Sequence, residues 1–293
     1  MSKIKNFYRL NDVYFKSLLG DKRRKKLTLN FLNCILKRTK DNQFINIDFD
    51  DKQMLPDKHK EKVPELDIVG TTNDGTKINI EVQVGEQDFY GSRAVYYWAK
   101  LHGRQMMSGD EYEFLRPTIS IHLLDFIYFD DDDRYHRSFH IRDDENNAVL
   151  SNDLELHFVE LKKFTFKDIR KLRGADTWYA YFSKNCTDDE RNVVAMSNPI
   201  IKEAMDYEAM FAKDDNLRRQ YEAAEKARRD QNAIANSAER RGEKRGEKRG
   251  EQRGIKKQAM ETAKSMLADN MDINLIMKYS GLSQQEIDAL KIK

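Results

Sequence analysis

The fold is decided by residues 65–84, which read ELDIVGTTNDGTKINIEVQV. Two apolar runs, at 65–69 and 77–84, are separated by TTNDG at 71–75, and Asn, Asp and Gly tolerate the positive φ angles of hairpin turns. In the second run, apolar and polar residues alternate from the first position to the last. Because successive side chains of a strand point to opposite faces, the segment predicts an antiparallel hairpin with one buried face.

The hairpin brings two carboxylates together. Folding about the turn places Asp67 opposite residue 80 or 81, so the Cβ atoms of Asp67 and Glu81 are expected to lie about 5 Å apart. Two adjacent carboxylates repel each other, and one stays protonated unless a cation lies between them. Mg²⁺ relieves this repulsion because it prefers oxygen ligands, and the backbone carbonyl of Val82 is a further candidate ligand. Gln83 lies on the same face, about 7 Å beyond Glu81, where its amide can orient an attacking water or a phosphate oxygen.

The rest of the pattern predicts a mixed α/β domain that ends near residue 210. Asn11 or Asp12 is suited to cap the first helix, since a side-chain oxygen can accept a free backbone N–H there. The expected elements are two helices within 12–37, an edge strand near 45–47, the hairpin, a helix at 89–107, strands at 118–129, 137–141 and 154–161, and helices from 166 to about 210.

Composition excludes several classes of protein. The 293 residues include 52 Lys and Arg and 50 Asp and Glu, for a net charge of +2. Residues 239–257 hold nine basic and four acidic residues, so the remainder carries about −3 and is no basic saddle for nucleic acid. No apolar run is long enough to span a membrane. Two cysteines provide neither a disulfide framework nor a Cys-based zinc site, and we expect a soluble, cytoplasmic protein.

The set of motifs resembles the PD-(D/E)XK nuclease superfamily, and within it the branch of recombination-promoting nucleases and transposase-like proteins. The resemblance implies a restriction-endonuclease-like α/β fold, in which helices flank a mixed sheet, with a C-terminal helical extension. It also implies Mg²⁺-dependent hydrolysis of phosphodiester bonds in DNA, with Mn²⁺ as a substitute, in recombination, mobile-element or defence biology. The matching segments are residues 12–20, 64–68, 80–83, 93–97 and 176–178.

Carried over by residue, the resemblance implies that Asp67 and Glu81 are metal ligands and that Gln83 occupies the usual lysine position. Glutamine carries no charge and cannot stabilise a pentavalent phosphate as lysine does. Arg93 and Lys100 recur with Tyr97 at i, i+4 and i+7, share one helix face and are candidates to supply the missing charge to a DNA phosphate. A structural ion pair is the alternative for Arg93.

Asp12 corresponds in the resemblance to an additional acidic residue on the first helix of many superfamily members. A plain N-cap is the alternative role for Asp12.

The C-terminal region has a different composition. Beyond a nuclease-like domain at 1–210, residues 211–257 form a charged segment with an Arg-Gly-Glu-Lys repeat at 241–256, and 258–293 predict a small helical hairpin. The repeat permits a long helix whose glutamates pair with Lys or Arg across turns, a basic arm on DNA phosphates, or a poorly ordered linker. We favour the helix, which would need a partner helix and so implies self-association.

The terminal hairpin has some features of a helix-turn-helix. Its second helix carries Gln284, Gln285, Glu286 and Asp288 where a basic recognition helix is expected, which favours an oligomerisation or inhibitory module. Two functions therefore stand at this point. One is a metal-dependent DNA endonuclease, and the other is a catalytically weak nuclease-fold protein that acts as a DNA-binding or regulatory oligomerisation module.

Overall fold

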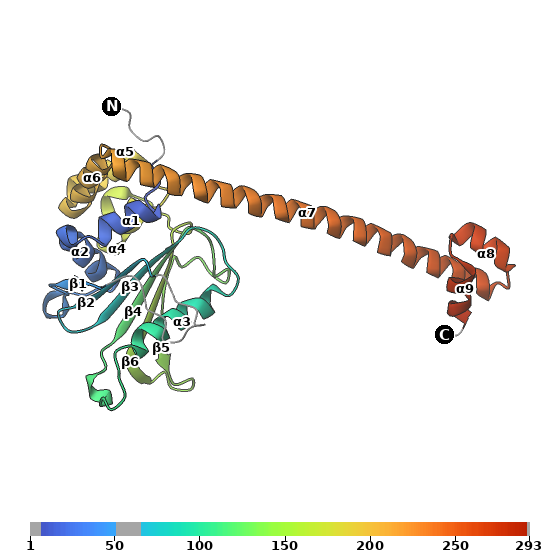
Figure 1. Ribbon diagram of the computed structural model, residues 1–293, viewed down its shortest axis with the longest axis horizontal. Coiled ribbons are helices and arrows are strands. Elements are labelled where there is room, and N and C mark those ends of the chain that lie inside the picture. Colours follow the sequence, from blue (N-terminus) through green and yellow to red (C-terminus); the bar gives the residue numbers. More distant parts are fainter. Residues whose placement is uncertain (1–6, 51–65, 292–293) are drawn as a thin grey trace. The chain divides into compact units, whose positions relative to one another are not determined.

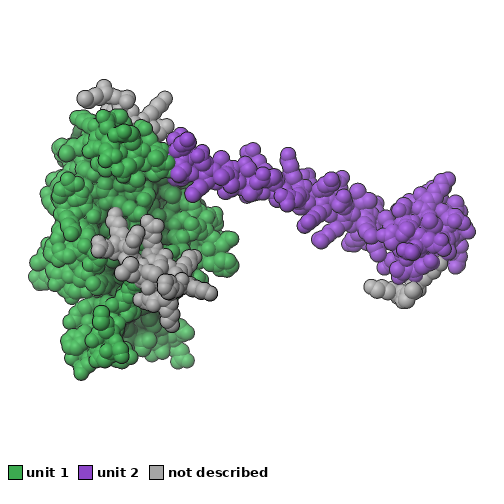
Figure 2. All heavy atoms as spheres, in the orientation of Figure 1, with its two compact units in different colours: residues 1–225 green, residues 226–293 purple. Residues whose placement is uncertain are grey.

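The computed structural model describes residues 7–50 and 66–291 (Figure 1). The chain forms two compact units, Met1–Glu225 and Lys226–Lys293, which Figure 2 shows in different colours. Pro64 and Glu65, which belong to the predicted hairpin motif, lie outside the described residues.

A six-stranded mixed sheet forms the centre of the first unit, as expected for this α/β class. Its strands lie in the order β1-β2-β3-β4-β6-β5. The β1–β2, β2–β3 and β5–β6 pairs are antiparallel, whereas β3–β4 and β4–β6 are parallel. The strands are β1 (Ile47–Phe49), β2 (Ile68–Thr72), β3 (Lys77–Gln83), β4 (Thr118–Leu124), β5 (His136–Arg142) and β6 (Val149–Glu160).

The predicted hairpin is confirmed as β2 and β3, with Ile68 opposite Ile80. By the same register, residues 67 and 81 face each other at the next position. β2 begins at Ile68 and runs to Thr72, three residues beyond the expected end, because the turn closes late: the Gly75 N–H donates to the Thr72 carbonyl at 2.9 Å. Gly75 has a φ of +86°, a left-handed conformation that favours glycine.

Helices cover both faces of the sheet. α1 (Asp12–Leu19), α2 (Lys25–Ile35), α4 (Ala175–Phe182) and α6 (Pro199–Phe211) share one large core with the strand residues Ile78 and Ile80. On the opposite face, α3 (Tyr90–Gly103) packs Tyr90 and Ala94 against Leu124 and Phe158 (Figure 1). α3 also provides the crossover that the parallel β3–β4 pair requires.

Local signals explain where the helices begin and end. Asn11 caps α1 by accepting the Val13 and Tyr14 N–H groups, and Asp12 is the first helical residue. The expected helical stretch from 166 to 210 is instead interrupted, with α5 (Asp188–Ser197) between α4 and α6. α5 starts at a capping box of Thr187 and Glu190, and α6 at Pro199, which cannot continue a preceding helix.

The second unit contains most of α7 (Asp215–Ala268), together with α8 (Ile273–Ser280) and α9 (Gln284–Lys291). Ala263, Ile276, Leu282 and Ile287 form its small core. The repeat lies within α7, so this segment is helical, as we favoured.

The prediction of ion pairs across turns of the repeat is wrong. None forms between residues 239 and 255, all of which the structure describes. A four-residue repeat places each glutamate one turn from another glutamate. No helix in the described ranges combines the length and the apolar character that a membrane span needs.

Candidate active site

The two predicted carboxylates meet at the end of the β2–β3 hairpin. The Asp67 N–H donates to Oε1 of Glu81 at 3.4 Å, and the Val82 N–H donates to Oδ2 of Asp67 at 2.9 Å. Because the Asp67 side chain accepts the Val82 N–H, this N–H does not pair with the backbone of the neighbouring strand. Asp67 is therefore not part of β2, which begins at Ile68. Glu81 is 6% exposed and the side chain of Asp67 is 15% exposed. The structure therefore brings Asp67, Glu81 and Val82 together.

Burial and mutual repulsion shape the electrostatics of this pair. Burial, and then the charge of Asp67, raises the pKa of Glu81 to about 8. Burial also raises the pKa of Asp67, against the opposing charge of Lys16. A pair of carboxyl groups that holds a proton near neutral pH lacks positive charge, which a divalent cation would supply. The donor set of two carboxylates fits such a hard cation.

Lys16 is a site residue that sequence reasoning missed. Its ammonium lies 2.9 Å from Oδ1 of Asp67 and 2.6 Å from Oδ1 of Asp12, so α1 brings both side chains to the hairpin. Although burial lowers the pKa of Lys16, the charge of Asp67 and contacts with Asp12 raise it overall, which keeps the ammonium charged. The available signal was the i, i+4 spacing of Asp12 and Lys16 on one helix face.

Gln83 contacts Arg93, one of the two expected cations. Nη2 of Arg93 donates to Oε1 of Gln83 at 2.7 Å, and Nη1 donates to Oε1 of Gln87. The Gln83 amide nitrogen donates to the carbonyl of Gly85 at 3.0 Å, so both ends of the amide are engaged. Lys100 lies about 10 Å farther along α3, with its ammonium 5.9 Å from the ring centroid of Tyr96.

Comparison with known proteins gives a family. A family model described as PD-(D/E)XK nuclease family transposase matches residues 9–238, which include the whole sheet, α1 to α6 and the first part of α7. The chain belongs to this family. A nuclease role associated with recombination follows from the membership, and the sheet and its flanking helices are those of a PD-(D/E)XK fold. No curated protein and no solved structure matches the chain significantly.

A second family model covers the C-terminus of this PD-(D/E)XK family member. It is described as the C-terminal HTH domain of the Rpn/YhgA-like nuclease family and matches residues 256–292. These residues include the end of α7, α8 and α9. Helix-turn-helix domains bind DNA. The match therefore favours DNA binding by the terminal hairpin, whereas its acidic second helix had favoured an oligomerisation or inhibitory module.

Behind the carboxylates, the PD-(D/E)XK domain has a buried polar layer between the sheet and α3. The hydroxyl of Tyr90 lies 2.9 Å from Nδ1 of His122, a residue 1% exposed that follows Ile121 in an apolar strand. Burial lowers the pKa of His122 to about 3, so its imidazole is neutral. Among the residues that the structure describes, the side chains of Asn79 and Ser120 and Nε2 of His122 are buried and have no hydrogen-bond partner. The sequence pattern of the strands did not predict a buried polar layer at these residues.

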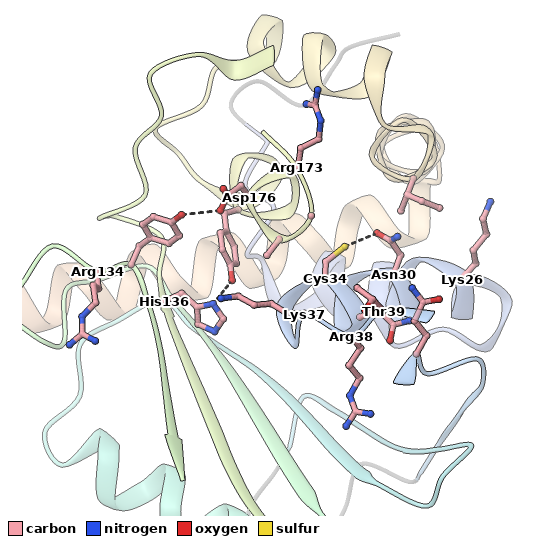
Figure 3. Close-up of a pocket in the computed structure, with 17 residues that line it drawn as sticks. Lys26, Asn30, Cys34, Lys37, Arg38, Thr39, Arg134, His136, Arg173 and Asp176 are labelled. Carbon is pink, nitrogen blue, oxygen red and sulfur yellow. Dashed lines mark hydrogen bonds between the residues drawn. The ribbon is translucent and has the colours of Figure 1, made fainter. Parts of the chain in front are cut away.

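A cavity of the PD-(D/E)XK domain lies away from these residues. About 980 Å³ in volume, it opens between α2, β5 and α4 and is lined by none of the predicted site residues (Figure 3). Figure 3 shows Lys37 beside His136, whose Nδ1 lies 3.0 Å from the Tyr179 hydroxyl. Nε2 of His136 lies 2.8 Å from Nδ1 of His157, and His136 is half-buried.

Proposed function

We propose that the protein is a Mg²⁺-dependent DNA endonuclease that hydrolyses phosphodiester bonds. One observation carries the proposal: at the end of the β2–β3 hairpin the Asp67 N–H donates to Oε1 of Glu81 at 3.4 Å and the Val82 N–H donates to Oδ2 of Asp67 at 2.9 Å, so two largely buried carboxyl groups converge there. Membership of a nuclease family supports the same conclusion.

Asp67, Glu81 and the carbonyl of Val82 would hold the ion. In a β-strand, the N–H and the C=O of any one residue point to the same side. The Val82 N–H donates to Asp67, so the Val82 carbonyl also points toward Asp67. Within the described ranges no three His, Cys, Asp or Glu side chains form a metal cage, so water and phosphate would complete the shell, as Mg²⁺ prefers. Mn²⁺ suits the same oxygen donors. The bound ion supplies a water of lowered pKa and offsets phosphate charge.

The cations of the site act on the substrate and on the carboxylates. Arg93 presents a planar guanidinium that Gln83 and Gln87 hold from one side, and its remaining N–H groups can donate to a DNA phosphate. Since both ends of the Gln83 amide are engaged, we assign Gln83 the role of positioning Arg93. Lys100, one more cation of α3, contacts a more distant phosphate. Lys16 opposes the rise in the pKa of Asp67 that burial causes, and it forms ion pairs with both Asp67 and Asp12.

Plasmid cleavage with Mg²⁺ tests the proposal. We expect the wild type to nick or linearise the plasmid, and Asp67→Asn and Glu81→Gln to lower the rate at least 100-fold each, as removal of one transition-state contact typically does. Asp48→Asn is the matched control, because Asp48 is a carboxylate on β1 that is 74% exposed and pairs with Lys25. Cleavage that persists in both site variants at equal purity would reject the assignment.

A second function is favoured by the C-terminal helix-turn-helix match. In this alternative the protein binds DNA, turns over slowly, and assembles as a homo-oligomer through the C-terminal helices. Gel shifts in Ca²⁺ and sizing of the full chain test it. Tight binding with no nicking at any Mg²⁺ or Mn²⁺ concentration supports the alternative, whereas cleavage that depends on Asp67 and Glu81 contradicts it.

A further inference from the structure

Phe89, the residue before α3, combines two unfavourable features. Its side chain is 81% exposed, and its backbone is left-handed, with a φ of +58° and a ψ of +28°. A bulky residue rarely adopts this conformation, because its Cβ crowds the neighbouring carbonyl oxygen. Within residues 7–50 and 66–291, the ring joins no hydrophobic cluster and no aromatic pair. The packing of the described residues therefore does not use the ring.

The neighbours of Phe89 hold it in this conformation. Tyr90 is 1% exposed and bonded to His122. The Gly91 N–H donates to the Tyr128 hydroxyl at 2.9 Å, and a Cβ on Gly91 would meet that same oxygen at 2.9 Å. The start of α3 is therefore anchored to β4 and the segment that follows it. Because these anchors turn Tyr90 inward, they turn the preceding ring toward solvent.

The exposed ring lies next to the proposed phosphate contact. The Arg93 N–H donates to the Phe89 carbonyl at 3.1 Å, and the Arg93 guanidinium reaches Gln83 and Gln87, at either end of the loop that leads to Phe89. This hydrogen bond places the backbones of Phe89 and Arg93 one helical turn apart, about 5.4 Å along α3. Consecutive bases of a DNA strand rise by about 3.4 Å. Phe89 thus lies within one or two base steps of a phosphate held by Arg93.

We propose that Phe89 stacks on a nucleobase that flanks the cleaved phosphodiester and that is unstacked in the complex, as at a kink, a nick or a single-stranded end. The inference rests on the proposed nuclease function. Phenylalanine is used both as a wedge between base steps and as a platform for single-stranded bases. Every base has a π-face, so the contact orders the substrate without reading its sequence. Phe89 is a DNA-contacting residue and takes no part in the bond-breaking step.

Binding of DNA labelled with 2-aminopurine tests the inference, with Ca²⁺ in place of Mg²⁺ to suppress hydrolysis. We expect Phe89→Ala to weaken binding about 5- to 150-fold, the range for loss of one base–aromatic stack, and to abolish the quenching that stacking causes. Phe89→Trp should retain both. Phe114→Ala is the matched control, because Phe114 is also exposed, at 62%, but follows the other end of α3.

Thermal unfolding separates a DNA contact from a structural role. Phe89→Gly removes the left-handed strain, so we expect Tm to rise by about 2–4 °C while DNA affinity falls. A parallel fall in Tm and affinity would make the ring a structural element and overturn the inference. So would a Phe89→Ala variant that binds and quenches within twofold of the wild type. Failure of the wild type to bind DNA would instead remove the proposed function itself.

Discussion

The ammonium of Lys16 lies 2.9 Å from Oδ1 of Asp67 and joins the first helix to the end of the hairpin. This ion pair is partly buried, with 19% of the Lys16 side chain and 15% of the Asp67 side chain exposed. Glutamine at position 83 leaves this end of β3 without a cation, and α1 brings Lys16 to Asp67. We therefore propose that α1, rather than β3, supplies positive charge to these carboxylates.

Lys16→Met should therefore impair hydrolysis. Loss of the ammonium leaves Asp67 part-buried without its charge partner, raises the pKa of both carboxyl groups, and weakens their hold on a cation. We expect kcat to fall about 100- to 1000-fold, the cost of one lost electrostatic contact in a catalytic site. Cleavage rates across Mg²⁺ concentrations measure this effect.

Lys16→Arg and Lys26→Met serve as controls for that prediction. The first keeps the charge and should recover part of the rate. The second removes an exposed lysine on α2 that pairs with Glu203, and should leave the rate unchanged. If Lys16→Met cleaves DNA as fast as Lys26→Met does, Lys16 is only a structural ion-pair partner.

Glu81→Gln should make the metal-free protein more stable while abolishing cleavage. The folded-state pKa of Glu81 is raised to about 8, above the ordinary value of 4.5, so the folded state keeps a proton that the unfolded chain has lost. Stability therefore falls as pH rises through this window. Removing the charge should add about 1–2 kcal/mol at pH 8, in line with trade-offs between stability and activity.

Unfolding curves of the two proteins between pH 6.5 and 8, without and with Mg²⁺, measure this difference. The lowered pKa values of His122 and His136 act in the opposite direction at lower pH, so the comparison avoids that range. Mg²⁺ should flatten the slope of the wild type only, because it replaces the proton. Equal pH slopes for wild type and Glu81→Gln would show that Glu81 is ionised in the folded protein.

The hairpin and its carboxylates followed from the sequence because they depend on short-range rules. Alternation fixes which residues share a face, and the turn sets the register within one position, which suffices to pair residue 67 with 81. Lys16 needs the packing of α1 against the sheet, and the contact between His136 and His157 joins β5 to β6, whose register shifts on either side of Ile141. Contacts of this kind depend on tertiary packing, so the spacing of apolar and polar residues in the sequence does not predict them.

Gln83→Lys should inactivate the protein, although lysine is the usual superfamily residue at this position. Oε1 of Gln83 accepts Nη2 of Arg93 at 2.7 Å, and an ammonium there would repel the guanidinium. We expect Gln83→Lys and Arg93→Gln each to lower DNA cleavage at least tenfold. The double variant restores one cation and one amide and should recover most of the activity, with a coupling of about 1–3 kcal/mol. Additive losses would show that Gln83 and Arg93 act independently.

Gly70→Ala should destabilise the sheet edge. A Cβ at position 70 would lie 2.8 Å from Cγ1 of Ile47 and 2.9 Å from the Asp48 carbonyl oxygen, so β1 must move away from β2. Overpacking of this kind costs about 1–3 kcal/mol. Gly103→Ala, in α3 with no atom within 4 Å of the new Cβ, should instead stabilise by about 0.5–1 kcal/mol. Urea unfolding of both variants checks the two signs, and a neutral Gly70→Ala would contradict the tight β1–β2 contact.

Charge substitutions in the repeat of α7 can test whether this helix binds DNA or a second copy of itself. At 100° per residue, the columns of Arg and Lys lie side by side, and the Glu column lies on the opposite side of the helix. Substituting Arg241, Arg245, Arg249 and Arg253 by Gln removes up to four phosphate contacts, so the slope of log K against log salt should fall by up to about 3.6. Substituting Glu243, Glu247 and Glu251 by Gln removes the opposite column.

The two sets of variants separate DNA binding from self-association. If the helix binds DNA, the Glu set should strengthen binding and leave the oligomeric state unchanged. If it pairs with a second copy of itself, both sets should weaken assembly, because each column faces the opposite charge of the partner. Filter binding at several salt concentrations and sedimentation of the full chain measure the two effects. An unchanged salt slope in the Arg set would exclude α7 from the DNA interface.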